Sequence, residues 1–116
     1  MHRIHYAGDS IVTGSAIARA LLDYAQALAQ VSESATVEIP TLTKDGRESV
    51  AEVLIGPASQ LSAHEEPGDH DEITDEALVT RMRTEADRLR RYGSSLPAAG
   101  IVTEDSVRVW SDLEDL

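Results

Sequence analysis

Residues 1–56 read MHRIHYAGDS IVTGSAIARA LLDYAQALAQ VSESATVEIP TLTKDGRESV AEVLIG, and this stretch decides the fold class. We expect a short apolar strand over residues 4–6, followed by Gly8-Asp9-Ser10 and then by a helix over residues 15–31. The apolar side chains of this helix recur at a spacing that places them on one stripe: Ile17, Leu21, Tyr24, Leu28 and Val31. A strand followed by an amphipathic helix indicates a helix that packs on a sheet.

Two strands joined by a hairpin turn follow this helix. Residues 36–43 and 48–55 are expected to be strands, because Val37 and Ile39 alternate with Glu38 in the first range. In the second range, Val50 and Leu54 alternate with Glu52, and Lys44-Asp45-Gly46-Arg47 joins the two strands. The Asp-Gly pair is a hairpin signal because glycine tolerates the positive φ that such a turn needs. Pro40 has no N–H to donate, so we expect its strand to be an edge strand or to carry a bulge at this residue.

The second half of the chain contains one clear helix. Residues 57–72 include Pro67-Gly68 within a run of acidic and His side chains without periodicity, which predicts a mobile acidic connector. A helix is expected over residues 75–92, with Thr74 as its cap. Its inner stripe consists of Leu78, Met82, Leu89 and Tyr92. We expect a short last strand over residues 107–110 and a frayed tail over residues 111–116.

Taken in order, these elements read β-α-β-β-α-β within a single domain of 116 residues. This order predicts an α+β two-layer sandwich of the ferredoxin-like type, with both helices on one face of an antiparallel sheet. If the last strand does not form, the alternative is a three-stranded sheet with an extended C-terminal arm.

The net charge of −11 limits the classes of partner. An acidic field of this size repels nucleic acid and anionic lipid, so we expect neither as a partner. The five Arg side chains of residues 80–92 are expected to neutralise the chain's own acidic segment, residues 61–79. The absence of cysteine excludes disulfides and thiolate zinc sites, and no apolar run is long enough to span a membrane. We therefore expect a cytoplasmic protein without a cofactor.

One short segment points to chemistry. The octapeptide Ile4-His5-Tyr6-Ala7-Gly8-Asp9-Ser10-Ile11 resembles the first block of the SGNH (GDSL-type) hydrolases, and this resemblance implies that Ser10 is the nucleophile. That family also uses an oxyanion-hole Asn and an Asp-x-x-His block. This chain has no Asn, and Leu61 and Pro67 occupy the positions three residues before His64 and His70. Because a serine without a positioned base is a weak nucleophile, these departures argue against hydrolysis.

The same segment has two further interpretations. As a tight strand-to-helix turn, it would use the side chains of Asp9, Ser10, Thr13 and Ser15 to satisfy backbone donors, with Thr13 or Ser15 as the helix cap. As a ligand-binding loop, it would hold a small anion at the helix N-terminus through the same four residues.

Residues 64–71 carry atoms that suit a divalent metal. Their spacing matches neither an EF-hand loop nor a helical zinc motif, so we interpret them as an acidic solvated linker and expect no metal site.

The sequence as a whole favours a non-enzymatic domain that acts through protein–protein contact. We expect a homodimer held by apolar contact, with Trp110 or the stripe of the first helix in the interface, or an acidic module that binds a protein partner. The alternative is a small-ligand or anion-binding domain, or a serine hydrolase, with its site between Gly8-Asp9-Ser10 and Ser15.

Overall fold

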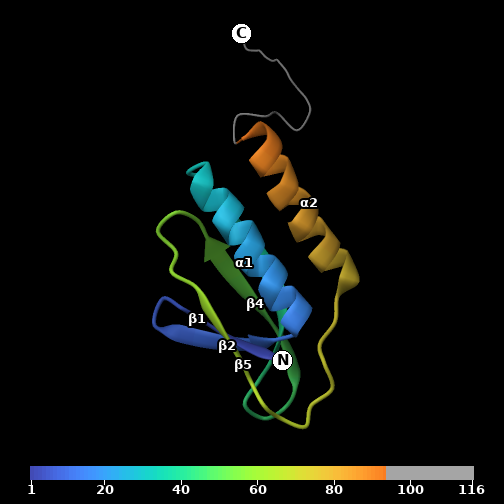
Figure 1. Ribbon diagram of the computed structural model, residues 1–116. Coiled ribbons are helices and arrows are strands. Elements are labelled where there is room, and N and C mark those ends of the chain that lie inside the picture. Colours follow the sequence, from blue (N-terminus) through green and yellow to red (C-terminus); the bar gives the residue numbers. More distant parts are fainter. Residues whose placement is uncertain (94–116) are drawn as a thin grey trace.

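The computed structural model describes residues 1–93, which form an α+β fold of five strands and two helices (Figure 1). The elements, in chain order, are β1 (His2–Tyr6), β2 (Asp9–Thr13), α1 (Ser15–Gln30), β3 (Ala35–Leu42), β4 (Glu48–Ile55), β5 (Ser62–Glu65) and α2 (Glu76–Tyr92). The strands form one sheet in the order β4-β3-β2-β1-β5, and every neighbouring pair is antiparallel. The α+β class is therefore confirmed.

The ferredoxin-like order is wrong for residues 1–93, because a β-hairpin precedes the first helix. Ala7 and Gly8 both have positive φ, of 51° and 78°, and Tyr6 pairs with Asp9 across the turn. A two-residue turn of this kind matches the twist of the two strands that it joins. Ser10 accordingly lies in β2, and the predicted strand-to-helix turn does not exist. The expected last strand at residues 107–110, the C-terminal arm and the tail at residues 111–116 lie outside the described residues.

The predicted connector, residues 57–72, also contains a strand. β5 pairs with β1, with His2 opposite Glu65, and the N–H of Glu66 donates to the carbonyl of Met1 at 3.0 Å. The four residues of β5 include three polar ones and no hydrophobic periodicity, so the sequence pattern did not reveal them. The mobility of this segment stays a prediction.

Pro40 lies in an interior strand, where the sequence indicated an edge or a bulge. All eight residues of β3 pair with β4 in an unbroken register, so there is no bulge. The Thr13 hydroxyl donates to the Pro40 carbonyl at 2.6 Å, which shows that this carbonyl faces β2. Within residues 1–93, β2 and β3 pair at one position, Val12 with Leu42. Pro40 therefore lies beyond the paired residues of β2 and β3, at a position where its missing N–H is not needed for the ladder.

The core lies between the sheet and α1, and α2 packs against α1 (Figure 1). The predicted stripe of α1 supplies three fully buried side chains, and β3 and β4 meet them with Val37, Ile39, Val53 and Ile55. Three of the four predicted stripe residues of α2 are buried, but the Tyr92 side chain is 60% exposed. The cap of α2 is Asp75 rather than Thr74, because the Asp75 carboxylate accepts the N–H of Leu78 at 3.1 Å.

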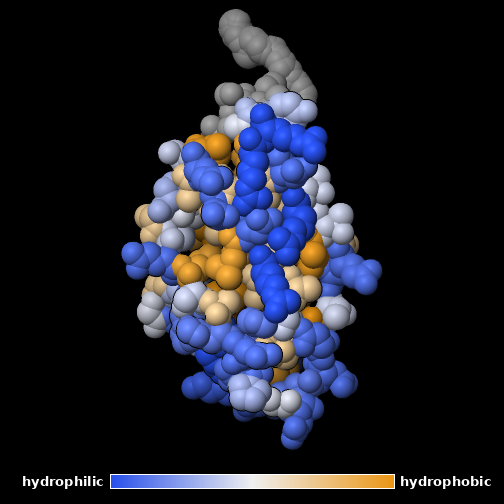
Figure 2. Space-filling model, in the orientation of Figure 1, coloured by the Kyte–Doolittle hydropathy of each residue, from blue (hydrophilic) through white to orange (hydrophobic). Residues whose placement is uncertain are grey.

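Ion pairs hold the two helices together. Asp23 on α1 accepts from Arg83 at 3.1 Å and from Arg90 at 2.7 Å, both on α2. The Arg90 hydrogen bond, with Arg83 beside it, lowers the pKa of the Asp23 carboxyl. Strongly hydrophilic side chains accordingly run as a band along the helical face (Figure 2).

The Arg side chains of α2 were expected to neutralise residues 61–79, and this expectation is wrong for the ion pairs that the structure describes. Arg83 and Arg90 pair with α1, whereas Arg88 and Arg91 pair with Glu85 and Asp87 of α2 itself.

Replacing Asp23→Asn should lower the free energy of unfolding by about 1 kcal/mol, because both cations of α2 lose a half-buried partner. Since folding lowers the pKa of Asp23, its contribution is present above the ordinary aspartate pKa and is lost as the pH falls through the lowered value. Urea unfolding at several pH values measures this dependence. Asp87→Asn is the matched control, because its pair with Arg91 is largely exposed; equal losses for the two variants would contradict the prediction.

Candidate functional site

The four residues predicted to form one ligand site lie in different environments. Ser10 is on the sheet face opposite the helices, together with Arg3 and Val12. Thr13 is fully buried and contacts Pro40. Ser15 begins α1, and its hydroxyl lies 2.7 Å from Nδ1 of His2. The structure therefore does not bring these residues together around a common ligand.

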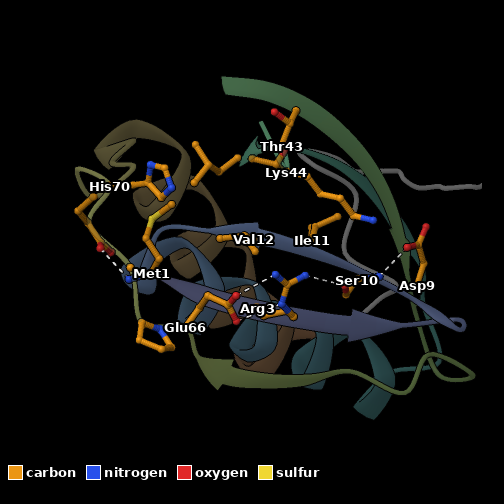
Figure 3. A pocket seen from close by; sticks show the side chains of 15 residues that line it. Met1, Arg3, Asp9, Ser10, Ile11, Val12, Thr43, Lys44, Glu66 and His70 are labelled. Atoms are coloured by element: carbon orange, nitrogen blue, oxygen red, sulfur yellow. Dashed lines mark hydrogen bonds and ion pairs between the residues drawn. The ribbon is translucent and has the colours of Figure 1, made fainter. Parts of the chain in front are cut away.

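Ser10 lines a pocket of about 660 Å³ between β1, β2, the end of β3 and residues 66–72 (Figure 3). Arg3 occupies its floor and donates to both carboxylate oxygens of Glu66, at 3.1 and 2.8 Å. The same guanidinium donates to the Ser10 hydroxyl at 3.0 Å. This hydrogen bonding raises the pKa of Arg3 and lowers the pKa of Glu66. Three of the five guanidinium donors of Arg3 are thus engaged by Glu66 and Ser10.

The arrangement around Ser10 does not provide nucleophilic catalysis. An activated serine needs a general base within hydrogen-bond reach, and the base needs a group that orients it. In residues 1–93, the side-chain partner of the Ser10 hydroxyl is the Arg3 guanidinium, which is a donor and not a base. The Asp9 carboxylate accepts the backbone N–H of Ser10 at 2.8 Å and closes the turn. The role implied by the SGNH resemblance therefore lacks its chemistry here.

A carboxylate of the chain itself occupies the N-terminus of α1. Gly14 is the N-cap and has no side chain to accept a hydrogen bond, so the expected cap at Thr13 or Ser15 is wrong. Instead, Glu72 accepts the backbone N–H of Ser15, and this bond lowers the pKa of the Glu72 carboxyl. Glu72 thus takes the place that the predicted anion would need.

The side chains of residues 64–71 whose atoms would suit a divalent metal do not gather into a ligand cluster. No group of three or more His, Asp or Glu side chains in the described part of the chain could hold a metal ion. His5 and His64 pack edge to face on the open side of the sheet, with ring centroids 5.4 Å apart. A pair of imidazoles without a third ligand is not a metal centre of the usual composition.

The uncovered face of the β3–β4 hairpin carries the exposed apolar side chains of the sheet. Val50 and Leu54 are 65% and 63% exposed, whereas Val53 and Ile55, on the other face of the same strand, are fully buried. Leu54 also lines a broad hollow of about 1060 Å³, which extends from β4 to the β1–β2 turn and residues 58–62. Exposed aliphatic side chains on one face of a strand, one of them lining a hollow, suit a contact surface.

Two glutamates lie between these apolar side chains. Glu38 on β3 is directly opposite Glu52 on β4, and both are exposed. Like charges at such a position destabilise a sheet. Neither Glu38 nor Glu52 has an ion-pair partner within residues 1–93. We define Glu38, Glu52, Val50 and Leu54 as the contact face.

The sequence contained the alternation that builds this face, but sequence reasoning missed its significance. Which face of a hairpin is covered depends on where the helices pack, and the alternation of residues 48–55 does not determine that. The facing glutamates could have been found by pairing residues 36–43 with 48–55 outward from the Asp45-Gly46 turn.

Comparison of the chain with protein-family models, with curated proteins and with solved structures found no match. In the described residues, neither helix combines the length and the apolar character that crossing a membrane requires.

Because Ser10 has no base, a fluorophosphonate probe should not label this residue. Ser10→Ala should lower the free energy of unfolding by about 1 kcal/mol or less, because solvent screening at the partly exposed Arg3 weakens its hydrogen bond to the Ser10 hydroxyl. Intact-mass spectrometry after probe treatment and urea unfolding measure the two effects. Stoichiometric labelling that Ser10→Ala abolishes would establish a reactive serine and overturn this assignment.

Proposed function

We propose that this protein is a non-enzymatic domain that acts through protein–protein contact, with the contact face as its binding surface. The observation that carries the proposal is the exposure of Val50 and Leu54 on the side of the sheet that the helices do not cover. Burying two such side chains against a partner would contribute about 1.5 to 3 kcal/mol each. Within residues 1–93, Val50 and Leu54 are not buried, so the fold does not gain this free energy.

The charge of the contact face supports an acidic partner module. Glu38 and Glu52 repel each other across the strand pair, and a cation from a partner would relieve this repulsion. The net charge of −11 gives the whole chain a long-range attraction for a basic partner.

A homodimer is the second candidate, because exposed apolar side chains on an end strand also suit a twofold contact. The predicted interface through the α1 stripe has no basis, since Ile17, Leu21 and Leu28 are buried within the chain. Trp110, the other residue expected in the interface, lies outside the described residues. An anion-binding or hydrolytic role at the Gly8–Ser15 segment is less well supported. Glu72 already accepts the N–H of Ser15, and the Ser10 hydroxyl has Arg3 and not a base as its partner.

A photo-crosslinking amino acid at Leu54 tests the proposed function. In the native host cell, it should form a covalent product with a second polypeptide, because the side chain at this position meets the partner. The matched control is Glu76, an exposed residue at the start of α2. Absence of a product at position 54, or equal products at both positions, would contradict the proposal.

Glu38→Gln should raise the free energy of unfolding by about 0.5 kcal/mol, because it removes the repulsion of Glu52 across the strand pair. Glu48→Gln on the same hairpin is the control, since Glu48 faces Leu42 and has no like charge opposite it. Urea unfolding of both variants measures the difference. A stability loss for Glu38→Gln would show that this carboxylate serves the fold instead of a partner.

Sedimentation velocity at low and high salt separates the two candidates. A dimer held by apolar contact should tighten as salt screens the repulsion of two acidic chains. A monomer at micromolar concentration under both conditions would exclude the homodimer and leave the separate partner.

A further inference from the structure

The backbone groups on the free side of β4 can be assigned from its partner strand. The carbonyl of Pro40 faces Thr13 of β2 and therefore points away from β4. Val50 is directly opposite Pro40. In an antiparallel pair, two opposite residues either exchange their hydrogen bonds or both turn them away from each other. Val50 thus directs its N–H and C=O away from β3, toward the free edge of the sheet. The residues at every second position along β4 do the same, namely Glu48, Glu52 and Leu54.

Within residues 1–93, the edge protection of β4 consists of two charged side chains, Glu48 and Glu52. Natural sheets protect their end strands with charged side chains, lysine above all, and with proline, bulges or short length. β4 has eight residues, contains neither lysine nor proline, and keeps an unbroken register with β3. Within residues 1–93, no other strand pairs with its outer side. An end strand of this kind is suited to binding an extended peptide by strand addition.

The residues with outward backbone groups also place their side chains on the uncovered face of the sheet. An added strand would therefore meet Leu54, Glu52, Val50 and Glu48 in turn, at alternate positions. Complementary side chains are apolar opposite Leu54 and Val50 and basic opposite the two glutamates. The alternation of apolar and acidic side chains on β4 thus specifies an alternation of apolar and basic side chains in its ligand.

We propose that β4 binds an extended segment of a separate protein, antiparallel to β4, whose sequence is apolar-x-basic-x-apolar-x-basic. This inference rests on the proposed function and names the partner of the same surface. Backbone hydrogen bonds to β4 supply the affinity, and the alternating side chains supply the specificity. Because Glu52 also faces Glu38, the first basic side chain of the segment lies near two carboxylates.

A second copy of this chain fits the edge less well. A twofold contact centred on Val50 sets Glu52 of one copy opposite Glu48 of the other, which places like charges at two positions. Each copy also carries a net charge of −11. The acidic pattern of β4 therefore disfavours pairing with itself and favours a basic strand.

A fluorescein-labelled peptide, acetyl-Val-Thr-Lys-Thr-Val-Thr-Lys-amide, is the probe for this surface. Fluorescence anisotropy with the full chain should show saturable binding, and hydrogen exchange of the Val50 and Glu52 amides should slow by at least tenfold at saturation. Glu52→Lys should weaken binding by at least tenfold, the size expected for one close charge pair. Glu76→Lys changes the net charge equally at a remote site and should change the affinity by less than twofold.

Four results would overturn the proposal. Equal weakening by Glu52→Lys and Glu76→Lys would mean that the peptide responds to net charge alone. Unchanged exchange of the Val50 amide would mean that it does not add to the edge. Tighter peptide binding after Arg108→Glu, in the Val-Arg-Val-Trp sequence of residues 107–110, would mean that this chain's own segment competes for β4. Crosslinking at Leu54 that persists in Glu52→Lys would retain the contact face while rejecting this occupant.

Discussion

The hydrogen bond from Thr13 to the carbonyl of Pro40 is the constraint on which the arrangement of the sheet depends. Within residues 1–93, the ladder between β2 and β3 consists of the pair of Val12 and Leu42, and Pro40, which has no N–H to donate, lies beyond it. The buried Thr13 hydroxyl satisfies the carbonyl that would otherwise have no partner. Within residues 1–93, the hairpin of β3 and β4 is therefore joined to β2 by this pair and by the Thr13–Pro40 hydrogen bond, and a broad hollow extends from β4 to the β1–β2 turn.

The two faces of the β3–β4 hairpin differ because α1 packs against only one of them. One face meets α1 and buries Val53 and Ile55, whereas the other leaves Val50 and Leu54 exposed beside two facing glutamates. The side chains of Ser10, Thr13 and Ser15 were candidate site residues in the sequence. In the structure they form hydrogen bonds with other parts of the fold, namely Arg3, Pro40 and His2. We expect Glu38 and Glu52, which face each other on the contact face, to destabilise the isolated domain, and the proposed binding function would account for their presence.

The sequence predicted the elements whose periodicity is long or whose turn chemistry is strong. The α1 stripe, the β3–β4 hairpin about Asp45-Gly46 and the span of α2 were all recognised. The β1–β2 hairpin was missed because Ala7-Gly8 does not have the composition of a favoured two-residue turn, and because β2 is short. β5 and the capping by Glu72 depend on contacts between segments far apart in the chain. Local sequence patterns do not indicate such contacts. The residues of the predicted ligand site lie in different environments because β2 pairs with β1, which is also a contact that the local sequence pattern does not indicate.

The most direct test of this account is the stability of Thr13→Val, which keeps the shape of the side chain and removes its hydroxyl. The account predicts a loss of about 1 to 3 kcal/mol in the free energy of unfolding, because the Pro40 carbonyl loses its partner. Thr41→Val is the matched control, since Thr41 is buried in the neighbouring strand and its side chain makes no hydrogen bond within residues 1–93. A loss for Thr13→Val no larger than that for Thr41→Val would contradict the account.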